Sequence, residues 1–413
     1  MTTRAAKDPK QYPVLRNLQF SPIKQGEEQY IVLWDPTGLG KEKLVLPLNY
    51  FFIVQHFDGA HSLMDISALY LKRFGEFLMP GKVEQLVADL DQKLFLEGER
   101  AEEARVQVRN EYRQAPLRPP LFAGRSYEAD GAKLKKQIDG FFTSSEGPDF
   151  KPSENAGQLI KGLVVPTYDL KQAGPVYAWA YKELQEAAQP DVYVIIGTAY
   201  AGLAKLFAVT DKDFETPLGV VRTDQPIMSQ LKNRLPASFE EDVCHQAEHA
   251  IEFQLPFLQH IVGDKRPFTI VPILCSFSAL DLSEGEARVA IDAFLEGLRD
   301  IMAGCGRSSC VIAAGELAHL GLRYGDKEPP TDFSFHRSMQ HDLEMLKHVE
   351  ELNPGAFAAY VQKEQDRRRI SGFAPIYSLL RLIQADKGEV LRYDRGISDQ
   401  YNSTVTYASM AFF

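Results

Sequence analysis

The chain has 413 residues, 45% hydrophobic and 25% charged, which is ample for globular cores, and its length favours two domains. Its formal net charge of -10 argues against broad binding to nucleic acid or anionic membranes. The opening residues lack a signal-peptide core, the most apolar window is interrupted by glycine and lysine, and the 4 cysteines form no CxxC pair, so we expect a cytoplasmic protein without a membrane span or a disulfide framework.

The first hundred residues predict a hairpin followed by small helices. Two apolar runs within residues 28–47 are separated by turn-forming residues at 35–40, which is typical of a β-hairpin. Ser62 and Asp65 have the spacing of a capping box and precede an amphipathic helix, and a second helix is expected after Pro80. A winged-helix unit over residues 1–105 is the prediction.

This pattern, over roughly residues 12 to 100, resembles the PqqD-like winged-helix domain, whose relatives bind leader peptides in peptide-modification systems. A winged helix could instead bind DNA, but the exposed face expected for the second helix mixes Lys82 and Lys93 with Glu84, Asp89 and Asp91. No nucleic-acid partner is therefore expected. The resemblance implies docking of a peptide or protein; the alternative is that this unit only packs on the next domain.

A charged segment followed by "APLRPPLFAG" predicts a linker over residues 106–119 and a second domain over 120–413. In that domain the short apolar runs "LIKGLVVP", "DVYVIIGTA", "FTIVPILCSF" and "SSCVIAAGELAHLG" alternate with helical patterns. Such alternation predicts an α/β domain with a buried sheet covered on both faces. Its site is expected beyond the carboxyl ends of the strands.

The blocks "AEHAIEFQLPFL", "FTIVPIL", "AHLG", "ISGFAPI" and "NSTVTYASMAF" occur in the order seen in the Memo family, and the chain resembles that family from about residue 120 onward. The resemblance implies an α/β fold with a mixed sheet flanked by helices on both faces, similar to the metal-dependent class III extradiol dioxygenases.

His245, Glu248 and His249 also form the pattern His-x-x-Glu-His of inverted zincins, in which two histidines bind zinc. The Memo motif includes Glu248 and His249 but does not call for His245, which disfavours a zinc peptidase. His249 and Glu252 are three residues apart and can share a helix face, so we expect both to face the cleft. A hydrogen-bonded structural role is the alternative for His249.

Three positions that the resemblance assigns to metal ligands have other residues here. Thr167 and Ala201 stand where the family has histidines, and Ser371 stands where it has a cysteine. Two hydroxyls and a methyl group cannot replace two imidazoles and a thiolate, so we expect no bound metal. Tyr168 and Tyr200 are expected to narrow the former metal cavity, with simple packing as the alternative.

Glu316 and His319 stand where the family has an aspartate and a histidine. With His249 they provide two imidazoles and a carboxylate, the composition of a non-haem iron site. They could also perform acid–base chemistry without metal, or Glu316 could simply hold His319.

These observations leave three hypotheses for the function. The leading hypothesis is a non-catalytic or weakly catalytic Memo-like protein with no cofactor, the partner of a radical SAM enzyme and an AMMECR-like protein, as the resemblance implies. The second is a redox or dioxygenase-type enzyme that uses iron at His249, Glu316 and His319. The third is a metal-independent hydrolase or isomerase that uses His319, Glu316 and Ser371; the chain has no Gly-x-Ser-x-Gly motif to support a serine hydrolase.

Overall fold

A computed structural model describes residues 8–413 apart from 27, 150–154, 156, 264–265 and 284. It divides into two compact units, Met1–Gln114 and Ala115–Phe413. Among the described residues, no helix has both the length and the apolar character needed to cross a bilayer.

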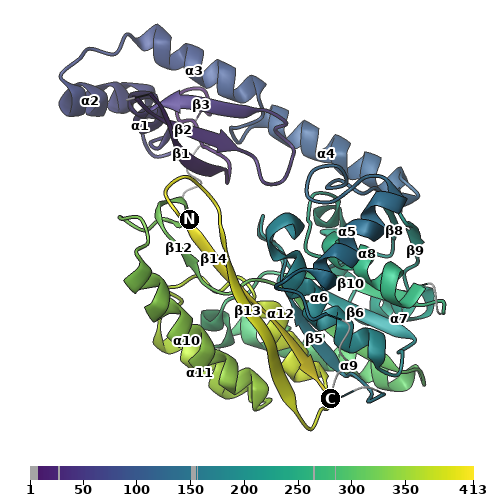
Figure 1. Ribbon diagram of the computed structural model, residues 1–413. Coiled ribbons are helices and arrows are strands. Elements are labelled where there is room, and N and C mark those ends of the chain that lie inside the picture. The colour runs from purple at the N-terminus through teal and green to yellow at the C-terminus, as the bar shows by residue number, and fades with distance from the viewer. Residues whose placement is uncertain (1–7, 27, 150–154, 156, 264–265, 284) are drawn as a thin grey trace. The chain divides into compact units, whose positions relative to one another are not determined.

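The N-terminal unit consists of a three-stranded antiparallel sheet, in the order β1-β2-β3, and four helices. Its elements are β1 (Gln19–Gln25), β2 (Glu28–Trp34), β3 (Lys43–Pro47), α1 (Leu48–Val54), α2 (Leu63–Phe74), α3 (Pro80–Gln92) and α4 (Glu99–Gln114) (Figure 1). Alternate residues of β2, Ile31 and Leu33, enter a core that Ile66 and Val83 of the helices complete. The predicted hairpin and both predicted helices are present, whereas the winged-helix assignment stays a prediction.

The start of α2 has the predicted capping box. The Ser62 side chain accepts a hydrogen bond from the Asp65 N–H, and the Asp65 carboxylate accepts one from the Ser62 N–H. These contacts satisfy backbone donors that the first turn of a helix leaves without partners. The helix ends at Gly75, whose φ of 72° is in the left-handed region that suits glycine.

The segment 106–119, interpreted above as a linker, is helical as far as Gln114 and then enters a short strand, β4 (Leu117–Arg118). Oppositely charged residues support this helix: Arg105 lies 3.3 Å from Glu102, three residues before it, and 2.7 Å from Glu97, which precedes the helix. Charge pairs at helical spacing stabilise a helix on an exposed face, which is why a strongly charged stretch can be helical rather than irregular.

The C-terminal unit is built on an eight-stranded mixed sheet with the order β12-β14-β5-β11-β6-β10-β7 and β13 beside β14. The central strands β5, β11, β6 and β10 are parallel, and the outer pairings are antiparallel. The strands are β5 (Gly162–Val165), β6 (Val192–Thr198), β7 (Phe207–Val209), β10 (Thr269–Cys275), β11 (Ser309–Ala314), β12 (His319–Leu320), β13 (Gly388–Ile397) and β14 (Thr404–Phe412). A smaller sheet pairs β4 with β8 (Asp213–Thr216) and β9 (Gly219–Val221).

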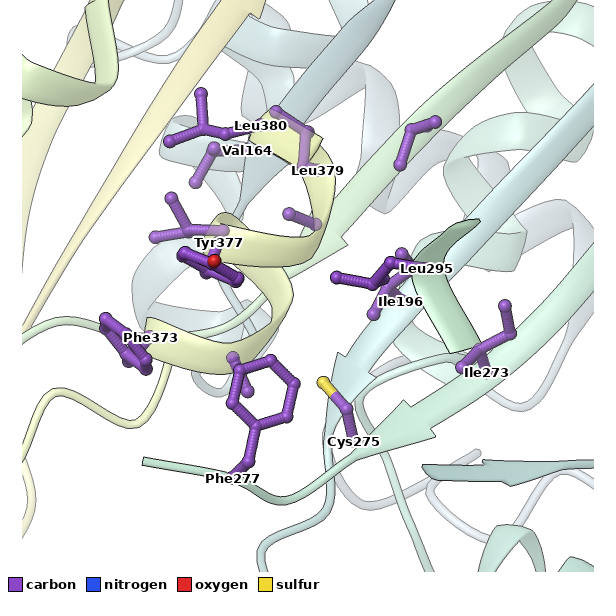
Figure 2. Packing of buried hydrophobic residues seen from close by; sticks show 14 of the residues in the cluster. Val164, Ile196, Ile273, Cys275, Phe277, Leu295, Phe373, Tyr377, Leu379 and Leu380 are labelled. Atoms are coloured by element: carbon purple, nitrogen blue, oxygen red, sulfur yellow. The ribbon is translucent and has the colours of Figure 1, made fainter. Parts of the chain in front are cut away.

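Helices cover both faces of the large sheet, as its apolar runs predict. On β6, Val194 and Ile196 enter one core cluster, and Tyr193 and Ile195 enter the other. Figure 2 shows the first cluster, in which Phe373, Tyr377, Leu379 and Leu380 lie among side chains of the sheet. The helices are α5 (Gly131–Thr143), α6 (Leu170–Glu186), α7 (Gln225–Arg234), α8 (Leu255–Leu258), α9 (Glu286–Gly304), α10 (Asp332–Glu350), α11 (Pro354–Lys363) and α12 (Phe373–Leu382).

The division into two units leads to a testable prediction. Limited digestion with trypsin should cleave after Arg113, an exposed residue in the last turn of α4, because frayed helix ends near domain boundaries are accessible to proteases. The C-terminal fragment should have the circular dichroism spectrum of a folded α/β domain, and it should unfold cooperatively. First cleavage after Lys182, a buried residue within α6, would contradict this division.

Candidate functional site

The candidate site lies where the carboxyl ends of the parallel strands β5, β6 and β11 meet, as expected for an open α/β sheet. Thr167 follows β5, Tyr200 follows β6 and Ser371 precedes α12. The Thr167 hydroxyl is 2.5 Å from the Tyr200 hydroxyl, which is 3.3 Å from the Ser371 hydroxyl. We call these three residues the hydroxyl cluster. The structure thus brings together three of the predicted cleft residues.

Tyr200 is the centre of the hydroxyl cluster. Burial raises the pKa of its phenol well above the usual value, and the nearby charge of Glu316 adds to that effect, so the group stays a neutral hydroxyl. Ala201 follows in a turn that is closed by the Gly202 N–H donating to the Ala199 carbonyl, and its methyl group can offer no ligand atom.

Glu248 and His249 form a carboxylate–imidazole pair beside the cluster. Glu248 Oε1 is 2.8 Å from both the backbone nitrogen and Nδ1 of His249, and Oε2 accepts from the Tyr200 N–H at 2.8 Å. Burial alone would raise the pKa of Glu248, but the charge and hydrogen bonds of His249 lower it. Burial likewise opposes protonation of His249, but Glu248 raises the pKa of that imidazole overall. The pair therefore favours its ionised form.

Glu316 and His319 form a second pair. His319 Nε2 is 3.0 Å from Glu316 Oε2, while Nδ1 faces the carbonyl oxygens of Leu317 at 3.1 Å and Arg369 at 3.0 Å. Because carbonyl oxygens only accept, Nδ1 has to be the donor on that side, and a proton must lie between Nε2 and Oε2 for that contact to be attractive. Both ring nitrogens of His319 are thus engaged by the protein.

Tyr168 lies at the edge of the site. Its hydroxyl is 3.1 Å from the Ser398 hydroxyl, which is also 2.7 Å from the Tyr324 hydroxyl, and its ring stacks on Tyr407. Gly396 is required beside it, because a Cβ at that position would lie 2.0 Å from Tyr168 Cε1. Tyr168 is therefore held by packing against Gly396 of β13 and Tyr407 of β14.

Glu252 does not line the cleft with His249, contrary to the expectation from their spacing. It is fully buried in the 3₁₀ helix η3 (Glu252–Gln254) and forms an ion pair with the fully buried Arg118. It also accepts from the N–H groups of Leu121 and Phe122 at 3.2 and 2.9 Å, and from the Tyr127 hydroxyl at 2.5 Å. A carboxylate without water needs a cation and donors, and these partners keep it away from the site.

The His-x-x-Glu-His pattern has no zincin geometry. His245 lies in the last turn of a 3₁₀ helix, η2 (Asp242–Gln246), which ends before His249. The two histidines therefore do not share an α-helical turn. Its Nε2 lies 3.0 Å from the Ala208 carbonyl oxygen, and burial lowers the pKa of the ring to about 4. His245 is a neutral, buried structural residue.

The iron alternative also lacks a ligand set. Over the described part of the chain, no three His, Cys, Asp or Glu side chains are arranged to hold a metal ion. Glu316 is near enough to influence His249, but His319 directs both nitrogens to protein partners. The hydroxyl cluster does not fit a transition metal either, because its three neutral oxygens hydrogen-bond to one another.

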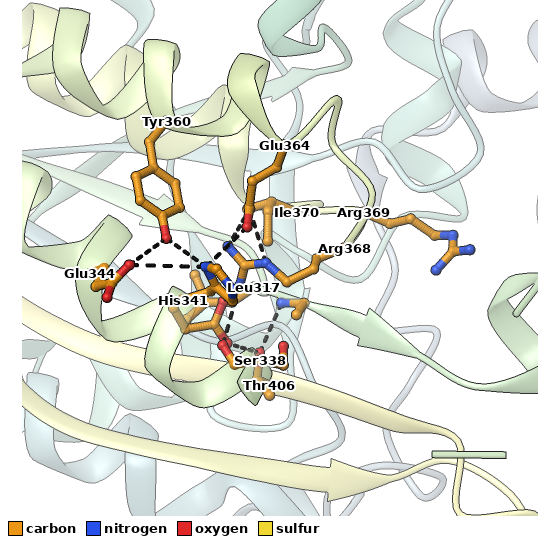
Figure 3. Close-up of polar contacts among 12 residues, drawn as sticks. Leu317, Ser338, His341, Glu344, Tyr360, Glu364, Arg368, Arg369, Ile370 and Thr406 are labelled. Atoms are coloured by element: carbon orange, nitrogen blue, oxygen red, sulfur yellow. Dashed lines mark hydrogen bonds and ion pairs between the residues drawn. The ribbon is translucent and has the colours of Figure 1, made fainter. Parts of the chain in front are cut away.

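A buried ion-pair network supports the loop that carries Ser371 (Figure 3). Arg368 contacts Asp342 and, at 2.7 Å, Glu364. The Asp342 carboxylate also accepts from the Thr406 hydroxyl at 2.6 Å, and the Arg368 carbonyl accepts from the His319 N–H at 2.8 Å. The loop includes left-handed φ values at Gln365, Asp366 and Arg369, which such contacts must hold in place.

Sequence reasoning missed two important partners at the site. Arg118 appears only as one basic residue in a Pro-rich stretch, and the sequence contains no sign of its distant partner Glu252. Glu248 was noticed as part of the zincin pattern and of the Memo motif, but its role as the partner of His249 was not predicted, although the two residues are adjacent in one family block.

Comparisons with known proteins identify relatives of this chain. A family model described as Memo-like protein matches residues 118–411. A MEMO1 family protein of Methanopyrus kandleri is 29% identical over 304 residues, covering 71% of this chain and 98% of that protein. A MEMO1 family protein of Aquifex aeolicus is 25% identical over 400 residues, covering 96% and 99%. The latter match therefore includes the N-terminal unit.

Breaking the buried pair should be costly. We expect Arg118→Met to lower the free energy of unfolding by about 3–5 kcal/mol, because it leaves the Glu252 charge buried without a cation. The control Arg222→Met removes a pair with Asp213 in which the arginine is 69% exposed, and it should cost less than about 1 kcal/mol. Urea unfolding measures both; equal losses would contradict the assigned role.

His245 should contribute a pH-dependent stability. Its folded pKa, about 4, lies below its ordinary 6.5, so the unfolded chain takes up a proton first as pH falls. Stability from this group is complete above about pH 6.5 and is lost down to about pH 4, by an amount on the order of 3 kcal/mol. His245→Gln should flatten unfolding free energy over that window, whereas His336→Gln, at an exposed position, should not. Parallel curves for wild type and His245→Gln would refute this.

Proposed function

The chain belongs to the Memo family, and from this premise we propose that it is a non-catalytic or weakly catalytic cytoplasmic member. It would act as the partner of a radical SAM enzyme and an AMMECR-like protein, with its N-terminal unit docking a peptide or protein. The observation that carries the proposal is the hydroxyl cluster at the strand ends, which joins Thr167 and Ser371, at two of the positions that the family resemblance assigns to metal ligands, through Tyr200.

The chemistry of this cluster supports a role without bound metal. Thr167 and Ser371 are joined through the Tyr200 phenol, so each of the three hydroxyls has a hydrogen-bond partner within the protein. A phenol binds a transition metal well only as phenolate, and the raised pKa of Tyr200 opposes that ionisation. Imidazole and thiolate, the ligands that such metals favour, are absent from these three positions.

The N-terminal unit supports the docking proposal through its sheet edge. Among the residues that the structure describes, strand β3 pairs with β2 alone, so its outer edge offers backbone groups to an added strand. Beside it lies a groove of about 350 Å³ formed by residues of β3, α1 and α3. Its lining residues are Leu44, Leu46, Pro47, Tyr50, Leu86, Asp89, Leu90 and Lys93. An extended peptide could pair with the edge and place apolar side chains in the groove.

Restoring ligands should create metal affinity. A variant combining Thr167→His, Ala201→His and Ser371→Cys with Tyr200→Ala should bind zinc at least about 100-fold more tightly than wild type, since direct ligands outweigh the 10–100-fold effects of their supporting partners. Tyr200→Ala alone is the matched control, because it makes room without adding a ligand. Metal content after dialysis is the measurement; tight stoichiometric zinc or iron in wild type would contradict the proposal.

The docking groove can be tested by charge insertion. Leu86→Glu should weaken binding of the unit's partner about tenfold or more, through lost apolar burial and a desolvated carboxylate. Leu71→Glu, at an exposed position on α2 outside the groove, is the control. Calorimetry with the radical SAM enzyme and AMMECR-like protein of the same organism would measure this. Unchanged binding in Leu86→Glu, or no binding by wild type, would argue against it.

A further inference from the structure

One ring nitrogen of His249 has no hydrogen-bond partner among the described residues. Its Nδ1 is 2.8 Å from Glu248 Oε1, which determines the tautomer and orientation of the ring. Its Nε2 makes no hydrogen bond to any residue that the structure describes, and it is not one of the fully buried polar atoms that lack a partner, so this nitrogen keeps some contact with solvent. The ring is held in place before any ligand arrives.

The surrounding charges keep this ring a donor. Glu248 accepts from the backbone of Tyr200 and His249 as well as from the ring, and these bonds stabilise its ionised form and lower the pKa of its carboxyl despite burial. Glu316 and Glu252 also face His249 electrostatically, but Glu252 is neutralised by Arg118, and Glu316 shares a proton with His319. The protonated Nε2 of His249 is thus the donor at this site, and each of the three nearby carboxylates has its own partner in the protein.

Aromatic rings define the surroundings of that donor. Tyr200 stacks on His249 at a centroid distance of 5.0 Å, and Phe253 and Phe122 lie at 5.1 and 5.6 Å. Phe122 is partly exposed and Leu121, its neighbour in the chain, is exposed, so a ligand would find apolar surface near the His249 ring. Arg118 is fully buried and engaged by protein oxygens, so it cannot bind a ligand.

From this geometry we propose that His249 is the anchor of a binding site for a small monocarboxylate with an apolar remainder. One N–H donor suits one carboxylate oxygen, and the ring of Phe122 suits a hydrocarbon tail. Phosphate would need several converging donors, which this position does not offer. The proposal concerns a ligand site and does not depend on the docking role of the N-terminal unit.

Histidine signals in NMR spectra of the full chain test the proposal, with acetate, butyrate and inorganic phosphate as probes. The His249 signal, identified by its loss in His249→Gln, should shift saturably with butyrate, less strongly with acetate and not with phosphate. Binding should disappear as pH rises above the titration of His249, because the protonated ring is the donor. This pH dependence is read in the unmodified protein and needs no variant to fold.

The variants give the matched comparison. His249→Gln should bind butyrate about tenfold more weakly or worse, the usual effect of losing a charged hydrogen bond, while His336→Gln should match wild type. Phe122→Ala should remove the preference for butyrate over acetate. The proposal is overturned by a shift that does not saturate, by equal shifts at all histidines, or by binding that persists above the His249 titration.

Discussion

The ion pair between Arg118 and Glu252 is the constraint on which the site depends. Both side chains are fully buried, and isolated charges in such a place would cost several kcal/mol. The guanidinium also donates to the carbonyl oxygens of His245 at 3.0 Å and Glu248 at 2.8 Å, so nearly all of its donors are used. This pair thereby joins the chain around Arg118 to the segment that carries the Glu248–His249 pair.

The consequences extend to the cleft wall. Because Glu252 also accepts from the N–H groups of Leu121 and Phe122, the turn that brings the Phe122 ring against His249 is held by the same carboxylate. On the other side of the site, the Arg368 network holds the loop before Ser371. The hydroxyl cluster thus lies between two segments that buried charges fix in place.

Local patterns in the sequence were sufficient for much of the fold. The capping box at Ser62 depends only on residues that are close in the chain. The apolar run of β6 predicts a strand buried on both faces, and alternate residues of that strand enter the two core clusters. Both signals are visible in a single sequence. The segment predicted as a linker is helical as far as Gln114, which the sequence did not indicate, because charged residues suit an exposed helix as well as an irregular segment. Composition cannot distinguish these two states.

The site was predictable only in part, because some of its contacts join residues that are far apart in the sequence. Strand ends identify Thr167, Tyr200 and Glu316 as neighbours, since parallel strands bring their carboxyl ends together. The orientation of Glu252 was not predictable, because it depends on a cation 134 residues away in the chain, and helical spacing was assumed where the backbone forms 3₁₀ turns. Spacing rules hold only for the helix type that they assume.

The central claim is that two hydroxyls, of Thr167 and Ser371, and the methyl group of Ala201 occupy the positions that the family resemblance assigns to metal ligands. Its most direct test is an anomalous difference map from crystals of the unmodified protein soaked in zinc or iron(II). The account predicts no peak beside Tyr200, and a Tyr200 hydroxyl still within hydrogen-bonding distance of Thr167 and Ser371. A strong peak bonded to the hydroxyl cluster, or to His249, Glu316 and His319 together, would contradict it.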